Sequence, residues 1–246
     1  MLAIIGGSGL TKLANLEVGR RKVARTPYGD PSGAVTFGRV GANEILFLAR
    51  HGYGHTIAPH EVNYRANLWA LKQCGADAVV SVASVGGIRN DIWPGTLVLP
   101  HQIIDYTWGR ASTFFEGPGT PVNHIDFTEP YSRQMRARLL SAAANAGERI
   151  MDGGVYAATQ GPRLETAAEI NRLERDGAEL VGMTGMPEAA LAREIGLEYA
   201  AIAVVANYAA GRGDSERAVP LDKIEAVLEE AMGRVRRIIE KLCEAQ

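Results

Sequence analysis

Cysteine is scarce in this sequence, with only Cys74 and Cys243 among its 246 residues. Neither lies in a CxxC pattern or at a zinc-ligand spacing from a histidine, and two cysteines do not build a disulfide framework. The sequence therefore argues against a disulfide-rich domain and against a zinc domain. We expect each cysteine to lie on a helix as a small apolar residue.

Long apolar segments and runs of one charge are also missing. No segment approaches the roughly 20 apolar residues of a membrane-spanning helix. The N-terminal MLAIIGGSGL lacks the basic region and long apolar run of a signal peptide. The 26 basic and 28 acidic residues give a net charge of -2, without a long basic run. We therefore expect a cytoplasmic protein that binds neither membranes nor nucleic acid.

Short apolar runs are present, and they alternate with helical patterns. Nearly continuous apolar runs predict strands covered on both faces, at residues 2–5, 44–49, 77–82, 96–99, 154–158, 179–182 and 199–205. Helical patterns predict helices at residues 60–74, 165–175, 187–195 and 221–242. The alternation predicts an α/β fold, a single domain over residues 1–246 whose central mixed, largely parallel β-sheet is flanked by helices. Residues 109–130 are predicted to form a long loop.

Polar residues and glycines follow several of the predicted strands. In open α/β sheets, ligands gather beyond the carboxyl ends of the strands. We therefore expect one pocket lined by the residues at these ends, which are Ser8, Arg50, His51, Ser84, Gly86, Gly87, Met183, Thr184 and Asn207.

The turn after the first predicted strand is rich in glycine, with the sequence Gly6-Gly7-Ser8-Gly9. Such a turn can expose backbone N–H groups to an anion. It is not a dinucleotide fingerprint, because Lys12 stands where a third glycine or alanine belongs, and it lacks the GK[ST] of a P-loop. From these residues alone, an ordinary tight turn is the alternative interpretation.

Arg50 and His51 follow the predicted strand at residues 44–49. Arginine offers a planar set of donors that matches a phosphate group, whereas a surface arginine beside a structural histidine is the alternative. His51, His55 and His60 lie close together in the sequence, but no HExxH or similar ligand spacing occurs. We therefore predict no metal site.

The segment at residues 48–72, LARHGxxHTIxPHEVNYRANxWALK, resembles the purine nucleoside phosphorylase superfamily in its methylthioadenosine phosphorylase branch. Further similar segments follow in the expected order: SVASVGGIR (81–89), PGTLVLPHQIID (94–105), GPRLETAAE (161–169), MTGMPEAALAREIGLEYAAIA (183–203) and NYA (207–209). The resemblance spans almost the whole chain. It implies a nucleoside phosphorylase-like fold, a homotrimer, and cleavage of a purine nucleoside by phosphate.

The resemblance also implies roles for individual residues. Phosphate would be bound by Ser8, Arg50, His51, Ala83, Ser84 and Thr184. Met183 would contact the ribose, and Asn207, Arg50 and His51 would carry the catalysis. One arginine, hydroxyl groups and backbone N–H groups can hold a phosphate dianion without a metal. We therefore expect no cofactor, with inorganic phosphate as a co-substrate.

Glu165 and Asn207 favour a 6-oxopurine base. Methylthioadenosine phosphorylases usually carry aspartates at the positions of Asn207 and Ala209. Glu165 follows Leu164 in GPRLET, where 6-oxopurine enzymes carry a glutamate that accepts N1–H. Adenine has no N1–H, so the mismatch would cost about 1–3 kcal/mol. A first-turn helix carboxylate is the alternative for Glu165, and Tyr208 completes the predicted base site.

The residues near the sugar 5' position favour a methylthio group. Ordinary 6-oxopurine enzymes place a histidine near the 5'-hydroxyl, but no histidine follows His124 in this chain. Val219, Leu221 and Ile224 are apolar, and one methyl-sized contact is worth about 1 kcal/mol. His124 lies in the long loop, which in relatives reaches towards a neighbouring subunit's 5' pocket. The combination predicts phosphate-dependent cleavage of S-methyl-5'-thioinosine.

Other functions stay open on the sequence. The nearest alternatives are a methylthioadenosine phosphorylase and a general 6-oxopurine (inosine or guanosine) nucleoside phosphorylase. A nucleoside hydrolase would need no phosphate, and a non-catalytic purine-binding protein would bind without turnover. A dinucleotide-dependent dehydrogenase is the alternative at the level of the fold, and Lys12 weakens it.

Overall fold

The computed structural model describes residues 1–10 and 16–245, and within them eleven strands form one mixed sheet. The strands are β1 (Leu2–Gly6), β2 (Glu17–Lys22), β3 (Val35–Val40), β4 (Asn43–Ala49), β5 (Ala78–Gly87), β6 (Leu97–Leu99), β7 (Gln102–Asp105), β8 (Met151–Asp152), β9 (Val155–Ala158), β10 (Leu180–Gly182) and β11 (Glu198–Tyr208). The helices are α1 (Tyr64–Gln73), α2 (Arg133–Asn145), α3 (Ala167–Arg175), α4 (Gly185–Glu194) and α5 (Leu221–Glu244), with a 3-10 turn at Gly213–Ser215.

The centre of the sheet is parallel. Strand β1 pairs in parallel with β4 and β5, and β5 pairs in parallel with β11. Antiparallel pairs join β2 to β3, β3 to β4, β10 to β5 and β6 to β11. The main path runs β2-β3-β4-β1-β5-β10-β9-β7. This arrangement confirms the predicted class, a mixed and largely parallel sheet flanked by helices.

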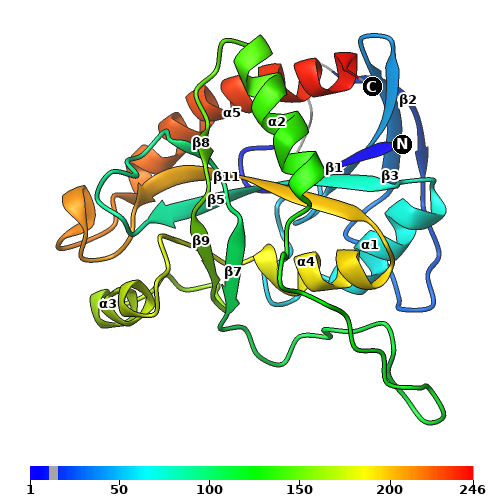
Figure 1. Ribbon diagram of the computed structural model, residues 1–246, viewed down its shortest axis with the longest axis horizontal. Helices are drawn as coiled ribbons and strands as arrows, with labels where there is room; N and C mark the ends of the chain where they lie inside the picture. Colours follow the sequence, from blue (N-terminus) through cyan, green and yellow to red (C-terminus); the bar gives the residue numbers. More distant parts are fainter. Residues whose placement is uncertain (11–15, 246) are drawn as a thin grey trace.

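Helices cover both faces of the sheet, as Figure 1 shows, with α2 and α5 on one side and α1 and α4 on the other. Alternate residues of β1 supply the two cores. Ala3 and Ile5 belong to the core that includes residues of α1 and α4, whereas Leu2 and Ile4 belong to the core under α2 and α5. Both faces are buried, so the strand reads as a continuous apolar run rather than as an alternating one.

The predicted helices differ from the observed ones mainly at their starts. Helix α1 begins at Tyr64 rather than at residue 60, because the Asn63 side chain accepts from the Ala66 N–H and caps it. Helix α3 begins after Thr166, which forms a capping box with Glu169. Met186 has extended backbone angles, so the regular part of α4 begins at Pro187, as the sequence predicts.

Several elements were not predicted from the sequence. Strand β2 is exposed along its whole length and carries no apolar pattern, so periodicity could not reveal it. Helix α2 does carry a signal, because Ser132 caps it and its buried residues have helical spacing: Met135, Leu139, Ala142 and Ala143. The loop prediction holds, since no helix or strand is assigned over the described residues 106–132.

The expectation that both cysteines lie on helices is confirmed for Cys243 and misses Cys74 by one residue. Cys74 follows the last residue of α1, and Cys243 is buried in α5. Among the described residues, no helix is both long enough and apolar enough to cross a membrane.

Candidate active site

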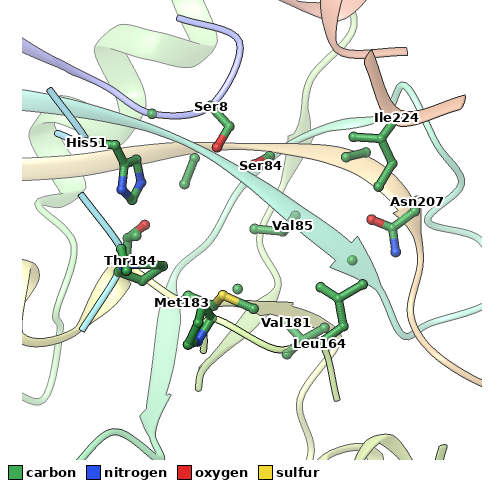
Figure 2. Close-up of a pocket in the computed structure, with 18 of the residues that line it drawn as sticks. Ser8, His51, Ser84, Val85, Leu164, Val181, Met183, Thr184, Asn207 and Ile224 are labelled. Atoms are coloured by element: carbon green, nitrogen blue, oxygen red, sulfur yellow. The ribbon is translucent and has the colours of Figure 1, made fainter. Parts of the chain in front are cut away.

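One cavity of about 470 Å³ lies beyond β1, β4 and β10 and beside the last parts of β5 and β11. The residues predicted from the sequence that line it include Ser8, Arg50, His51, Ala83, Ser84, Gly86, Leu164, Glu165, Met183, Thr184, Asn207 and Ala209. Gly87, which was predicted with Gly86, is not part of the lining. Figure 2 shows Ser8, His51 and Thr184 towards one end of this cavity, and Asn207, Leu164 and Ile224 towards the other. We call these the phosphate end and the base end.

The glycine-rich turn forms part of the phosphate end. The Leu10 N–H donates to the Gly7 carbonyl, which closes a tight turn. A Cβ added at Gly7 would lie 2.5 Å from the Val82 carbonyl oxygen and 2.8 Å from Arg50 Nη1, so only glycine fits there. The Ser8 hydroxyl lies in the cavity wall, 3.4 Å from His55 Nε2. The segment is therefore both a tight turn and a wall of the cavity, while Lys12 falls outside the described residues.

Arg50 is fully buried, and most of its donors are already engaged. Its Nε and Nη2 donate to the two carboxylate oxygens of Glu188 at 2.7 and 2.9 Å, and Nη1 donates to the Val82 carbonyl at 3.0 Å. Nη2 also lies 2.6 Å from the Ser81 hydroxyl oxygen. The planar fork of Arg50 is thus turned towards Glu188, and the part nearest the glycine turn is Nη1.

Glu188 receives further hydrogen bonds, from the hydroxyl groups of Ser81 and Tyr199, each at 2.8 Å. Burial raises the pKa of the Glu188 carboxyl, but the charge of Arg50 and these hydrogen bonds lower it by more. Burial also disfavours the charged form of Arg50 and lowers its pKa. The charge and hydrogen bonds of Glu188 raise that pKa by more, so it lies above its ordinary value. Both groups are therefore charged at neutral pH, and together they form a buried neutral pair.

His51 is neutral at physiological pH. Burial, followed by the charge of Arg50, lowers its pKa from 6.5 to about 4. Nδ1 lies 2.8 Å from the Ile57 carbonyl oxygen, which can only accept, so Nδ1 carries the proton. The other ring nitrogen, Nε2, is then an acceptor. The centre of the His51 ring lies 4.8 Å from the centre of the His55 ring, and His55 is a second histidine of the cavity wall.

At the base end, one oxygen of Glu165 is held in place. The Thr159 hydroxyl donates to Glu165 Oε1 at 2.6 Å. Glu165 precedes Thr166, the residue that caps α3, so it is not part of the first turn of that helix. The structure therefore favours the cavity interpretation of Glu165 over the helix-dipole alternative.

Asn207 enters the cavity because β11 is irregular at that point. The register of β11 with β5 shifts between Val205 and Asn207, and a bulge of this kind re-aims the side chains that follow. Asn207 Nδ2 donates to the Tyr208 carbonyl at 2.7 Å. The Tyr208 ring itself packs against Gly213, where an added Cβ would lie 2.6 Å from the ring. Tyr208, predicted in the base site, is therefore placed outside the cavity lining.

Of the three apolar residues predicted near the sugar 5' position, two line the cavity and one does not. Val219 and Ile224 line the cavity. Leu221 opens α5 and is 66% exposed, and the buried residues of that helix begin only at Leu228. His124 is exposed on the long loop and does not line the cavity of its own chain.

Sequence reasoning missed some residues around the cavity. Residues 55–59 line it, although no role in the pocket was predicted for them from the sequence. Glu188 had a usable signal, since it is the one charged residue in the otherwise apolar stretch at residues 185–192 of helix α4. Thr159 had no such signal, because its role depends on a hydrogen bond to the Glu165 carboxylate, six residues further along the chain. Among residues 1–10 and 16–245, no three His, Cys, Asp or Glu side chains are grouped to hold a metal ion.

Comparison with known proteins agrees with this fold and cavity. The family model of the phosphorylase superfamily matches residues 1–244. A protein of Pseudomonas syringae pv. tomato named probable S-methyl-5'-thioinosine phosphorylase is 52% identical over 243 residues, covering 99% of this chain and 98% of the relative. The 6-oxopurine nucleoside phosphorylase of Pyrococcus furiosus is 46% identical over 215 residues, covering 85% of this chain and 80% of its own length.

Solved structures agree as well. Methylthioadenosine phosphorylase from Schistosoma mansoni in complex with adenine superposes with a TM-score of 0.94 at 32% identity, covering 99% of this chain and 91% of that one. The α/β sheet and its strand-end cavity thus define an enzyme of the nucleoside phosphorylase type. The chain belongs to the phosphorylase superfamily, which confirms the family resemblance in its sequence.

Proposed function

We propose that this enzyme cleaves S-methyl-5'-thioinosine with inorganic phosphate, releasing hypoxanthine and 5-methylthioribose 1-phosphate for purine salvage. One observation carries the choice of base: the Glu165 carboxylate and the Asn207 amide lie in the wall of the same cavity. The similarity to relatives named probable S-methyl-5'-thioinosine phosphorylase supports the same choice.

The two base-end side chains match a 6-oxopurine in hydrogen-bond character. Thr159 occupies Glu165 Oε1, which leaves Oε2 to accept the N1–H of hypoxanthine. One N–H of Asn207 is used by the Tyr208 carbonyl, so its second N–H can donate to O6 or N7. Adenine offers no N1–H, and its binding would cover the half-buried Glu165 carboxylate oxygen without giving it a partner, at a cost of about 1–3 kcal/mol.

The phosphate end suits a hydrogen-phosphate dianion. The neutral Arg50–Glu188 pair brings no net charge, so the anion would be held by Nη1 of Arg50, hydroxyl groups and backbone N–H groups. Ser8, Ala83, Ser84 and Thr184 supply that wall. His51 Nε2 is an acceptor and suits the one P–OH group of the dianion.

The reaction follows from this arrangement. The bond from C1' to the purine nitrogen lengthens first, and the ribosyl group becomes a cation whose neighbour is Met183. The bonding pair leaves with the purine, and a phosphate oxygen then bonds to C1' from the opposite face. The purine anion takes up a proton through solvent and the new sugar phosphate releases its P–OH proton, which leaves neutral hypoxanthine and a sugar phosphate dianion. Asn207 stabilises the charge on the departing base, and preplaced donors avoid reorganisation during the step. No covalent bond to the enzyme is formed.

We also propose the wider setting of the enzyme. It would need no cofactor, because phosphate itself is the second substrate. We propose a cytoplasmic homotrimer in which His124 of one subunit, together with Ile125, approaches the 5' pocket of a neighbour. The exposed apolar side chains Trp108 and Val122, at 72% and 78%, support a covered loop surface.

The test is a comparison of phosphate-dependent rates on methylthioinosine, methylthioadenosine, inosine and guanosine. We expect the highest kcat/KM for methylthioinosine and no turnover without phosphate. Equal rates with and without phosphate would contradict the proposal. Asn207→Asp should shift the preference towards methylthioadenosine, and an unchanged ratio of adenine to hypoxanthine nucleosides would refute the assigned role of Asn207.

A second candidate is a general 6-oxopurine nucleoside phosphorylase, favoured by the relative from Pyrococcus furiosus. The 5' wall offers mainly Val219 and Ile224 to tell a methylthio group from a hydroxyl. Such apolar contacts give about 1 kcal/mol per methyl-sized group, so discrimination would be moderate. The same assay separates the two candidates through the ratio of methylthioinosine to inosine.

A further inference from the structure

Arg110 lies on the long loop between β7 and α2, behind the cavity rather than in its lining. Its guanidinium joins two segments that do line it. Nη1 donates to the carbonyls of Met183 and Met186 at 2.8 and 2.6 Å. Nη2 donates to the carbonyls of Gln160 and Thr159 at 2.9 and 3.3 Å. One side chain thus ties residues 183–187, which we call the sugar segment, to residues 159–166, which we call the base segment.

A third part of the wall is connected through Tyr64. Arg110 Nη1 lies 3.2 Å from the Tyr64 hydroxyl oxygen, and that hydroxyl donates to the Pro59 carbonyl at 2.8 Å. Pro59 lines the cavity beside the phosphate end. The guanidinium carbon also lies 5.5 Å from the centre of the Tyr64 ring, within the range of a cation–π interaction. Three segments far apart in the sequence therefore meet at one cation.

The acceptors around Arg110 are all uncharged: four backbone carbonyls and one phenol. A planar guanidinium can serve several carbonyls at fixed angles, whereas a lysine ammonium is a single point on a flexible stem. The bonds leave the Met183 and Thr159 side chains free for the site, because they use only main-chain oxygens. The contact set is thus suited to holding backbone segments at a fixed spacing.

We propose that Arg110 is a positioning residue that fixes the spacing between the base segment and the sugar segment of the cavity. The inference rests on the proposed function for its substrate. Bond cleavage requires the base, the ribose and the phosphate to be aligned together, and a misplacement of about 1 Å can cost about 100-fold in rate. Binding of the base alone requires only one of the two segments.

The experiment compares Arg110→Met and Arg110→Lys with the control Arg65→Met. Arg65 is matched because it anchors the same loop, through the Thr113 carbonyl and an ion pair with Glu116, without touching the two segments. For Arg110→Met we expect kcat for methylthioinosine to fall at least tenfold, with KM and hypoxanthine affinity changed less than about threefold. Arg110→Lys should recover only part of kcat, and Arg65→Met should keep kcat within twofold.

A second readout does not depend on the substrate. In Arg110→Met, amide hydrogen exchange should become faster at residues 159–166 and 183–187, and in Arg65→Met it should stay as in the unmodified enzyme there. If the unmodified enzyme fails to turn over any nucleoside but the exchange result appears, the proposed function fails and the positioning role stands. If Arg110→Met shows normal exchange in both segments, or a kcat equal to that of Arg65→Met, the positioning role is wrong.

Discussion

The phosphate end and the base end of the cavity are built differently. At the phosphate end, the side chains of Arg50 and Glu188 are 0% and 1% exposed and are locked by hydrogen bonds to the core. At the base end, Leu164 is 41% exposed and Glu165 lies on the turn before α3. One end is anchored in the packed interior, whereas the other is formed by loop residues, the end of β11 and the start of α5.

This difference indicates which end of the cavity is easier to change. The relatives are named for methylthioinosine, 6-oxopurine nucleosides and methylthioadenosine, although they match this chain over most of its length. A phosphate end fixed in the core is costly to change, because each alteration leaves a buried polar group unpaired. Loop residues can be exchanged without disturbing the core, so specificity can change at the base end.

The largest expected effect would break the phosphate end. Glu188→Gln leaves the charge of Arg50 buried without its counter-charge, so we expect the free energy of unfolding to fall by about 3–5 kcal/mol. Urea denaturation at pH 7 measures it. The matched change Glu244→Gln, in an exposed pair with Lys241, should leave the midpoint nearly unchanged. Equal midpoints for the two variants would show that the buried pair has no special weight.

The next prediction concerns His51 and pH. Its pKa is lowered from 6.5 to about 4 in the folded state, so between these values the unfolded chain binds a proton that the folded chain does not. Stability from this residue is therefore present above pH 6.5 and is lost as the pH falls towards 4. The shift corresponds to about 3 kcal/mol.

His51→Asn removes the titrating ring and can still donate to the Ile57 carbonyl. We expect the pH dependence of its unfolding free energy, measured from pH 7.5 to pH 4, to be flatter by about that amount than in the unmodified protein. Parallel curves for the two proteins would mean that His51 is not held neutral. The base end does not contribute to this pH dependence, so the measurement probes the phosphate end selectively.

At the base end we expect a smaller, substrate-selective effect. Glu165→Ala removes the acceptor for N1–H, so kcat/KM for methylthioinosine should fall by roughly 5- to 150-fold, equivalent to about 1–3 kcal/mol. Thr159→Val, which only frees the carboxylate, should cost less. The KM for phosphate is the internal control and should change less than about twofold. If it rises in step with the nucleoside effect, the two ends are not separate.

The same contrast explains how far the sequence could predict this structure. Strand-end residues such as Ser8, Arg50 and Asn207 could be placed together, because parallel strands bring their carboxyl ends to one edge. The contacts behind them could not be predicted, since the bond between Arg50 and Glu188 joins positions 138 residues apart and follows no local pattern. Arg110, on a loop with no periodicity, gave no signal at all.

Two predicted residues were misplaced for local reasons. Tyr208 follows Asn207 directly and packs against Gly213, because neighbouring side chains of a strand point to opposite faces. Leu221 belongs to the apolar stripe of α5 in sequence, but burial of that stripe begins only at Leu228. Periodicity gives the face of an element and not the point where its packing starts.

The smallest expected effect sharpens the comparison within the base end. Ile224 is half-buried in the cavity wall, and Leu221, one turn earlier, is exposed outside it. Ile224→Ala should lower kcat/KM for methylthioinosine by about fivefold relative to inosine, since about 1 kcal/mol of apolar contact to the methylthio group is lost. Leu221→Ala should leave the ratio of kcat/KM for methylthioinosine to kcat/KM for inosine unchanged. If Leu221→Ala changes that ratio as strongly as Ile224→Ala, the start of α5 closes over the bound nucleoside, and the 5' wall includes more of the helix than the cavity shows.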